Sequence, residues 1–236
     1  MFSMKNMRSI WRTADARLWR DVLAVAATAS LVGASFGAIA VAAGMPVWLC
    51  CVTSLVVFAG GSQFMMVGIL AAGGGPVAAV LAALVLNARH LPFGLAIGHL
   101  ISDNRLGRLL GSHVLIDENT AFVLAERDPE RARALYWVAG GCFFVLWNLG
   151  TLVGAYGGDQ LGDPAAFGLD AAFPAAMFAL LLPALRDRNT VRAVLLGGAI
   201  ALAVTPLVPA GVPVLLALVG LLVVRRTPAT KETVPA

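Results

Sequence analysis

Residues 22–88 begin VLAVAATASLVGASFGAIAV and end LAALVLNA, and they form a run of 67 residues without a single Asp, Glu, Lys or Arg. A helix that spans a bilayer needs about 20 apolar residues, so this run is long enough for two or three crossings. Residues 193–224 form a second uncharged run, of 32 residues. Strands of a membrane barrel are only about 10 residues long, so runs of this length favour helices. We therefore predict an all-α, polytopic bundle of transmembrane helices.

The composition excludes several other classes of protein. The chain is 59% hydrophobic and 13% charged, whereas a soluble domain carries roughly 25% charged residues. The net charge of +4 does not indicate a nucleic-acid partner, because the basic residues lie beside apolar runs, where they orient helices. The sequence contains no hydrolase, metalloprotease or P-loop motif, so we expect no enzymatic activity. Cys50, Cys51 and Cys142 lie inside apolar segments without metal-ligand spacing, so we expect neither a metal nor a cofactor.

We divide the chain into an interfacial helix at residues 1–21, a single transmembrane domain at 22–225 and a tail at 226–236. The first part alternates basic and large apolar side chains, which is typical of a helix lying on anionic lipid. Its positive charge places the N-terminus in the cytoplasm. We expect eight spans with both termini in the cytoplasm, at residues 22–43, 47–71, 77–100, 109–125, 135–156, 167–185, 191–209 and 212–224.

Residues 109–125 are the ambiguous segment, because they contain polar side chains such as His113, Asp117 and Asn119. If this segment crosses the membrane, the basic clusters that follow it lie in the cytoplasm. If it does not cross, they lie outside, against the positive-inside rule. We therefore expect a crossing that is sheltered by protein, and seven spans with a re-entrant segment is the alternative.

The stretch FAGGSQF at residues 58–64 predicts a broken helix near the middle of the bilayer. Gly60 and Gly61 each weaken a helix by about 1 kcal/mol relative to alanine, and Ser62 and Gln63 follow them. The alternative is close packing of small residues, with Gln63 bridging two helices. Pro174 predicts a second break, because proline removes a backbone hydrogen bond.

A short internal echo accompanies these breaks. Residues 31–34 read LVGA, and so do residues 152–155. Transporters are often built from repeats whose helices break at matching places, although a match this short also arises by chance.

Arg89 lies near the centre of the third expected span. A central arginine costs roughly 2.5–3.5 kcal/mol on insertion scales, so it should face a cavity or an acidic partner. Asp117 and Glu118 are the candidate partners, and only one of them can face Arg89 directly. His90 could relay protons, and a hydrogen-bonded core histidine is the alternative.

Five motifs together resemble the AzlC family, the large subunit of bacterial branched-chain amino acid exporters. They are FAGGSQF at 58–64, NARH at 87–90 ahead of FG at 93–94, DE at 117–118, WNLGT at 147–151 and LDAAFP at 169–174. The resemblance covers about residues 20–225. The departures are Gly61 where the family usually has alanine, Ile116 where threonine commonly stands, and Pro92, which puts the continuity of the third helix in doubt.

The resemblance implies secondary-active export of leucine, isoleucine, valine and often methionine across the bacterial inner membrane. It also implies a small AzlD-type membrane subunit as partner. Two other functions stay open: a membrane assembly subunit that does not itself transport, and a channel-like pore for another small solute.

From the polar residues and the helix breaks we predict a site for a zwitterionic amino acid. Three groups of residues make up this prediction. The substrate-binding residues are Gly60, Gly61, Ser62, Gln63, Asn87 and Arg89; the residues that couple protons or charge are His90, Asp117, Glu118 and Asp170; and the supporting residues are Asn148 and Pro174. Met65 and Met66 would suit a pocket that accepts several aliphatic side chains, because thioethers adapt to irregular shapes. Core packing is the alternative for both.

The topology can be tested by labelling introduced cysteines with a membrane-impermeant thiol reagent. A cysteine at Asn104 should react in intact cells, and a cysteine at Asp128 should react only once the cytoplasmic side is opened, because a span lies between them. Labelling of both positions from one side would contradict eight spans.

Overall fold

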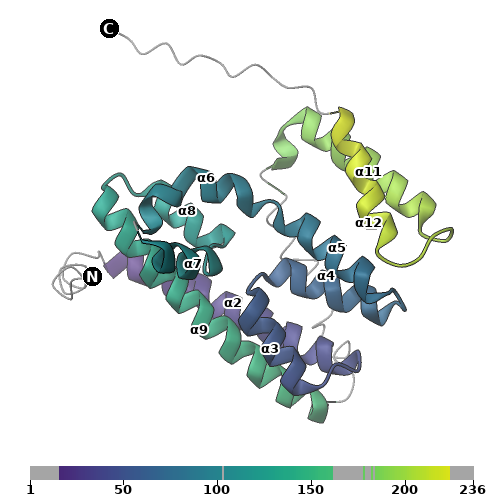
Figure 1. Ribbon diagram of the computed structural model, residues 1–236, viewed down its shortest axis with the longest axis horizontal. Coiled ribbons are helices and arrows are strands. Elements are labelled where there is room, and N and C mark those ends of the chain that lie inside the picture. Colours follow the sequence, from purple (N-terminus) through teal and green to yellow (C-terminus); the bar gives the residue numbers. More distant parts are fainter. Residues whose placement is uncertain (1–15, 103, 162–177, 179–181, 183, 224–236) are drawn as a thin grey trace, which may run out of the picture.

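The computed structural model describes residues 16–102, 104–161, 178, 182 and 184–223. These residues contain helices and turns and no strand, which confirms the all-α class. The helices, shown in Figure 1, are α2 (Ala16–Ala42), α3 (Val47–Val57), α4 (Gly60–Ala71), α5 (Pro76–Asn87), α6 (His90–Ile101), α7 (Arg105–His113), α8 (Asp117–Ala125), α9 (Pro129–Leu161), η2 (Ala184–Arg186), α11 (Arg188–Val204), α12 (Val212–Leu216) and η3 (Ala217–Val223).

Helices α2 and α9 form the centre of the fold and lie against each other along most of their length (Figure 1). They run in the same direction, because Ser30, Ala34 and Ala38 of α2 meet glycines 150, 154 and 158 of α9 in that order. A Cβ atom built on Gly154 would overlap the backbone of Ala34. Small residues therefore allow two backbones to touch, as they do in many membrane helix pairs. The two LVGA stretches at residues 31–34 and 152–155 lie within this contact.

By length and composition, two of the described helices are able to cross a bilayer. They are α2 over Leu18–Ala42 and α9 over Pro129–Gly158, and the bent pair α5–α6 counts as a third if it is one span. The parallel direction of α2 and α9 is the one that the eight-span prediction requires for its first and fifth segments. The number of spans and the side of the termini stay predictions.

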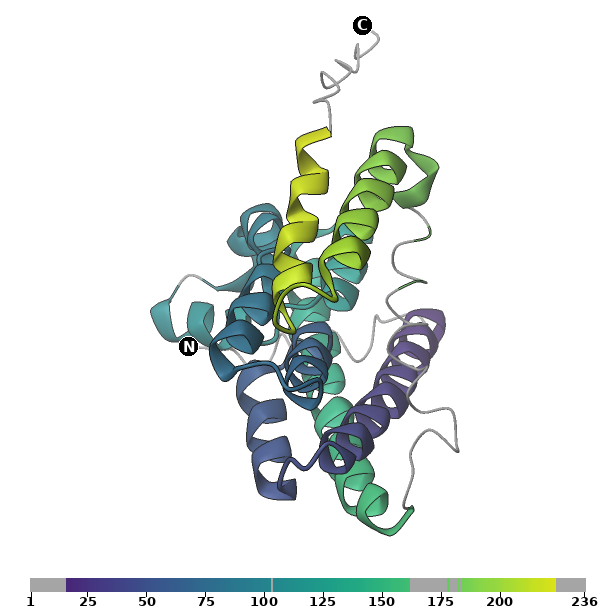
Figure 2. The ribbon, with the colours of Figure 1, turned by 90° about the vertical axis from the view of Figure 1, so that its right-hand side faces the viewer.

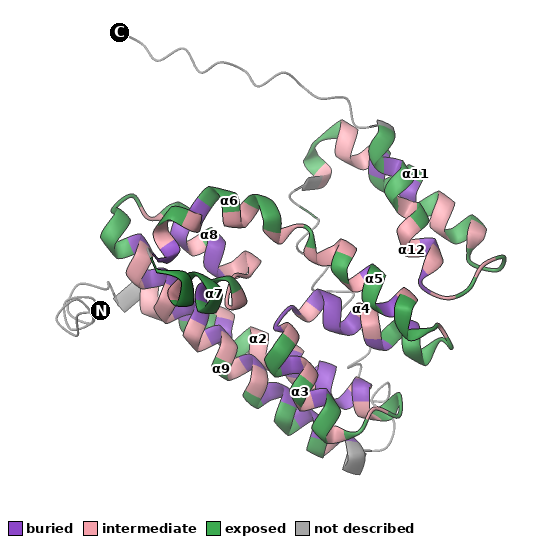
Figure 3. Ribbon diagram, in the orientation of Figure 1, coloured by how far each residue is buried: buried purple, intermediate pink, exposed green. Residues whose placement is uncertain are grey.

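Many large apolar side chains are exposed on the outer faces of the helices. Leu95, Leu202 and Leu222 are more than three-quarters exposed, and Figure 3 shows exposed residues along the outsides of α6 and α11. Buried residues gather instead along α2, α4 and α9 (Figure 3). Exposed apolar surface on this scale is typical of a protein that faces lipid, and it agrees with the predicted membrane class.

The second expected segment is broken, as predicted, and the break lies just before the two glycines. Helix α3 ends at Val57 and α4 begins at Gly60, with Phe58 and Ala59 between them. Phe58 adopts a left-handed conformation with φ of 34°, which costs a non-glycine residue about 1–3 kcal/mol. Its ring packs 5.0 Å from that of Phe144, between ring centroids, and this packing holds the strained residue in place.

The third expected segment is also broken, as Pro92 led us to expect, and the break lies one turn before the proline. Helices α5 and α6 meet at Ala88 and Arg89 with a bend of 50°. In a continuous helix residue 92 would donate its N–H to the Ala88 carbonyl. Pro92 has no N–H, so the helix is interrupted there, and the proline falls in the first turn of α6, where no such donor is needed.

The prediction of one helix over residues 109–125 is wrong, because α7 and α8 are two helices of nine residues each. The turn between them is stabilised by side chains that satisfy its backbone groups. The Asn119 amide donates to the Val114 carbonyl at 2.6 Å and accepts from the Ile116 N–H at 3.2 Å. The Tyr136 hydroxyl donates to the Gly111 carbonyl at 2.6 Å. As expected, protein shelters this polar segment, since Asn119 and Thr120 are buried.

Helix α11 packs against η3 to form a hairpin beside the main bundle (Figure 2). Gly197 and Gly220 permit a close approach between the two helices. Several predictions fall outside the described residues: most of the interfacial helix, most of the 167–185 span with Asp170 and Pro174, and the 226–236 tail.

The contact between α2 and α9 generates a stability prediction. Gly154→Ala should destabilise the fold by about 1–3 kcal/mol, because its methyl group meets the Ala34 backbone. Gly157→Ala is the matched control on the same helix, since a Cβ there meets nothing within 4 Å. Thermal unfolding in detergent, followed by size-exclusion chromatography, measures the difference. Equal melting temperatures for the two variants would show that this contact does not stabilise the fold.

Candidate functional site

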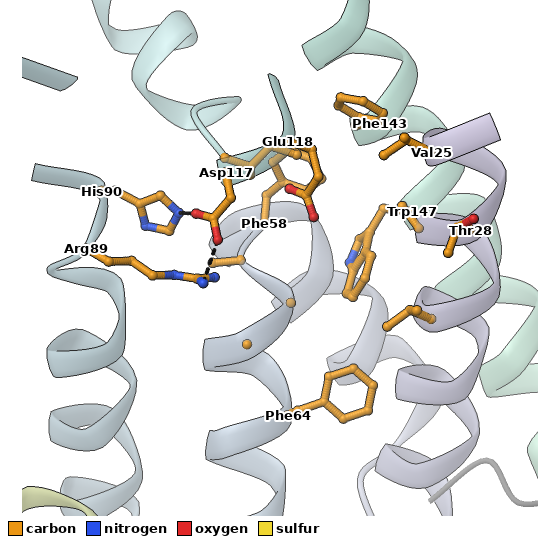
Figure 4. Close-up of a pocket in the computed structure, with 16 residues that line it drawn as sticks. Val25, Thr28, Phe58, Phe64, Arg89, His90, Asp117, Glu118, Phe143 and Trp147 are labelled. Atoms are coloured by element: carbon orange, nitrogen blue, oxygen red, sulfur yellow. Dashed lines mark ion pairs between the residues drawn. The ribbon is translucent and has the colours of Figure 1, made fainter. Parts of the chain in front are cut away.

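A pocket of about 390 Å³ opens where the helix breaks meet the central pair. Its volume lies in the range of roughly 300–1,000 Å³ that is typical of small-molecule sites. Figure 4 shows charged side chains at one end and mostly apolar ones around them. The lining residues are Val25, Thr28, Ala29 and Val32 from α2; Phe58, Ala59, Gly60, Gly61 and Phe64 at the α3–α4 break; Arg89 and His90 at the α5–α6 break; Ile116, Asp117 and Glu118 at the start of α8; and Phe143 and Trp147 from α9.

An ion pair joins two of the breaks. Arg89 Nη1 lies 2.6 Å from Asp117 Oδ2, with the two side chains 30% and 18% exposed. His90 Nε2 lies 3.6 Å from the other oxygen of the same carboxylate, Oδ1. The sequence left Asp117 and Glu118 open as partners of Arg89, and the structure pairs Arg89 with Asp117.

The two adjacent carboxylates point in different directions. Figure 4 shows the Asp117 carboxylate directed at Arg89 and His90, and the Glu118 carboxylate directed towards Trp147. Glu118 forms no ion pair with any described residue. The pocket therefore contains one neutralised acid and one acid that is free to meet a ligand.

His90 is oriented by the backbone at the α5–α6 break. Its Nδ1 lies 3.1 Å from the Asn87 carbonyl oxygen, which can only accept, so Nδ1 carries the hydrogen. Nε2, which faces Asp117, therefore carries a hydrogen only when the ring is cationic. This geometry can hold a proton between His90 and Asp117.

Three helices begin at the pocket, namely α4, α6 and α8. The first N–H groups of a helix have no acceptor within it, and the helix dipole adds a partial positive charge there. Asp117 and Glu118 occupy the first turn of α8 and offset its charge. The first turn of α4 contains Gly60 and Gly61. Glycine has no side chain, so nothing on these two residues covers their N–H groups.

The remaining predicted site residues that the structure describes, whether predicted to bind or to support, do not line this pocket. The Ser62 hydroxyl bonds to the Asn87 amide oxygen and, at 3.1 Å, to the Ala83 carbonyl, so Ser62 and Asn87 join α4 to α5. Gln63 is fully buried, and neither of its amide atoms has a partner among the described residues. Asn148 bonds to the Phe144 carbonyl within α9, at 2.8 Å. Met65 and Met66 pack beside a cluster formed by Ile69, Ala79 and Ala82, as the packing alternative expected.

Sequence reasoning missed several lining residues, above all Trp147. The WNLGT motif contains Trp147, but the site residue predicted from it is Asn148. Adjacent helical residues face directions about 100° apart, so only one of the two could face the pocket. Phe58 lies in the FAGGSQF stretch, but nothing there predicts that its ring lines a pocket, and Phe143 carries no signal that separates it from core residues.

Among the described residues, no group of three His, Cys, Asp or Glu side chains could hold a metal ion. Cys50, Cys51 and Cys142 are free thiols.

One comparison with known proteins finds a match. A protein-family model described as AzlC protein matches residues 24–161, which is more than half of the chain and includes every lining residue of the pocket. No curated protein and no solved structure matches the chain.

The ion pair generates a second stability prediction. Asp117→Ala should destabilise the fold by about 1–3 kcal/mol, because it leaves the half-buried Arg89 without its hydrogen-bonded partner. The double variant Arg89→Ala/Asp117→Ala should lose less stability than the two single variants lose together, since neither charge is then left unpaired. Thermal unfolding in detergent measures all three.

The more exposed pair between Glu126 and Arg131, at 3.4 Å, provides the matched control. Arg131→Ala should change stability by less than about 1 kcal/mol. Strictly additive losses at Arg89 and Asp117 would contradict a stabilising pair.

Proposed function

This chain belongs to the AzlC family, and we propose from that premise that it is the large subunit of a secondary-active exporter of branched-chain amino acids. Its substrates would be leucine, isoleucine, valine and also methionine. It would work as a multi-pass protein of the bacterial inner membrane, together with a small AzlD-type subunit, and it would have no enzymatic activity.

The observation that carries the proposal is a pocket that combines opposite charges with apolar walls. An amino acid with an aliphatic side chain carries a positive charge, a negative charge and an apolar group in one small molecule. Glu118 and the Arg89–Asp117 pair lie at one end of the pocket, and Val25, Val32 and Phe64 are among its apolar walls. Burial of an aliphatic side chain against such walls contributes about 25 cal/mol per Å².

The helix breaks support a carrier. Discontinuous helices at the substrate site are a recurring feature of secondary transporters, in which helix N-termini face anionic substrate groups. Here the α3–α4 and α5–α6 breaks border the same pocket. Phe58 adopts a strained backbone conformation at one of these breaks, and such strain is common at functional sites.

The Arg89–Asp117–His90 cluster supports coupling to protons. Protonation of Asp117 would weaken its bond to Arg89, and His90 lies close enough to exchange that proton. A change at this cluster would alter how α6 is held to α8, since the ion pair joins the start of one helix to the start of the other.

Efflux of radiolabelled leucine or valine tests the proposal. Cells that express the chain with its small subunit should export the amino acid faster than cells that lack the chain. Arg89→Ala should reduce the rate at least tenfold, because Asp117 is left as a second unpaired carboxylate in the pocket. Rates are compared at equal protein level in the membrane.

Arg192→Ala, which removes an exposed arginine of α11, is the matched control and should leave efflux unchanged. Unchanged efflux in the Arg89→Ala variant would overturn the proposed site. Full efflux from the small subunit alone would instead favour an assembly role for this chain. Flux that does not saturate would favour a pore.

A further inference from the structure

We propose that Glu118 and Trp147 recognise the two ends of a zwitterionic ligand. The Glu118 carboxylate accepts hydrogen bonds from the ligand ammonium, and the Trp147 indole N–H, with the first-turn N–H groups of α4, donates to the ligand carboxylate. Arg89 is then a positioning residue that orients Asp117 and does not bind the ligand. This assignment rests on the proposed function, because it concerns the same pocket.

Trp147 provides an unused hydrogen-bond donor. The side chain is 7% exposed, and its Nε1 is buried without a hydrogen-bond partner among the described residues. A buried indole N–H normally has a partner, and leaving it unpaired costs about 1–3 kcal/mol. Trp147 lines the pocket, where Figure 4 shows it facing the space beneath Glu118. A ligand acceptor in that space would satisfy the donor.

The indole lies directly against the first turn of α4. A Cβ built on Gly60 would lie 2.6 Å from Trp147 Cη2, so only glycine leaves room for the ring. The first backbone bond of α4 runs from the Gln63 N–H to the Ala59 carbonyl, at 3.0 Å. The N–H groups of Gly60 and Gly61 precede it and have no acceptor among the described residues. Indole and backbone donors therefore gather at one wall of the pocket, which suits a carboxylate.

Aromatic packing holds the indole in this position. Phe36 of α2 stacks on Trp147 with ring centroids 6.4 Å apart, and the rings of Phe36 and Phe64 pack edge to face with centroids 5.4 Å apart. All three side chains are less than one-tenth exposed. A donor that is fixed before the ligand arrives loses little conformational entropy on binding.

Glu118 provides the opposite charge. Arg89 is already neutralised by Asp117, so Glu118 is the remaining unpaired acid among the described residues of the pocket. A carboxylate beside walls such as Phe58 and Phe143 is costly unless a cation pairs with it. An ammonium group supplies three N–H donors to such an acceptor.

The positions of the two groups fit an α-amino acid. Figure 4 shows the Glu118 carboxylate directed towards Trp147, so acceptor and donor face one small space. The ammonium and carboxylate of an amino acid are attached to one carbon, and they can therefore reach both groups together. The aliphatic side chain is left to contact the apolar part of the wall, which includes Val25, Val32 and Phe64.

Binding to membranes that contain the full chain together with its small subunit tests the assignment with three ligands. Leucine carries both charged groups, 4-methylpentanoate lacks the ammonium, and 3-methylbutylamine lacks the carboxylate. Glu118→Gln should weaken leucine and 3-methylbutylamine about tenfold and leave 4-methylpentanoate unchanged. Trp147→Phe should weaken leucine and 4-methylpentanoate about tenfold and leave 3-methylbutylamine unchanged.

Matched controls are Glu130→Gln at the exposed start of α9 and Trp48→Phe on α3, which is 66% exposed. Neither should change any affinity. An equal loss for all three ligands in Glu118→Gln or Trp147→Phe would indicate a merely structural role and overturn the assignment. Selective loss of the two carboxylate ligands in Arg89→Ala, with no loss in Trp147→Phe, would also overturn it.

Efflux separates this inference from the proposed function. Leucine export at the normal rate in both Glu118→Gln and Trp147→Phe overturns the assignment and leaves the exporter standing. If the unaltered chain neither binds nor exports leucine but binds 3-methylbutylamine through Glu118, the exporter proposal falls and the ammonium site remains. Binding of none of the three ligands overturns both.

Discussion

The close contact between the backbones of α2 and α9 is the constraint on which the rest of the structure depends. Glycines and other small residues bring the two helices together in parallel, with Gly150 and Gly154 against Ser30 and Ala34. Lipid chains are as apolar as leucine side chains, so apolar contact alone does not drive such a pair together. Dispersion attraction between closely fitted backbones drives the two helices together instead. Backbones can fit this closely only where the side chains between them are small.

That contact also decides where the pocket lies. Val25 and Val32 from α2, and Phe143 and Trp147 from α9, form one side of it. The short helices α4, α6 and α8 approach this side with their N-termini, and their free N–H groups and charged side chains complete the site. A long rigid pair thus carries the apolar surface, and interrupted helices carry the polar chemistry. This arrangement meets the requirement that irregular backbone in a membrane protein be surrounded by protein.

The interruptions are compensated by specific contacts. Asn119 and Tyr136 satisfy the backbone between α7 and α8, and the Arg89–Asp117 pair joins α6 to α8. Phe58 keeps a strained conformation through its packing against Phe144. Each interruption therefore costs free energy that its neighbours offset, which is the pattern expected of a functional site rather than of a scaffold.

The sequence by itself determined the helical membrane class, the break near Gly60 and the choice of Arg89, Asp117 and Glu118 as charges that belong together. These follow from local chemistry, since charge-free runs, paired glycines and a central arginine have the same cost in any fold. Only the tertiary structure decided that Asp117 rather than Glu118 pairs with Arg89, that α7 and α8 are separate helices, and that Trp147 lines the pocket while Gln63 does not. Those outcomes depend on which face of each helix meets its neighbour. That face is set by the rotation of each helix and by contacts between residues far apart in the chain. Hydropathy along a single sequence does not encode either of these.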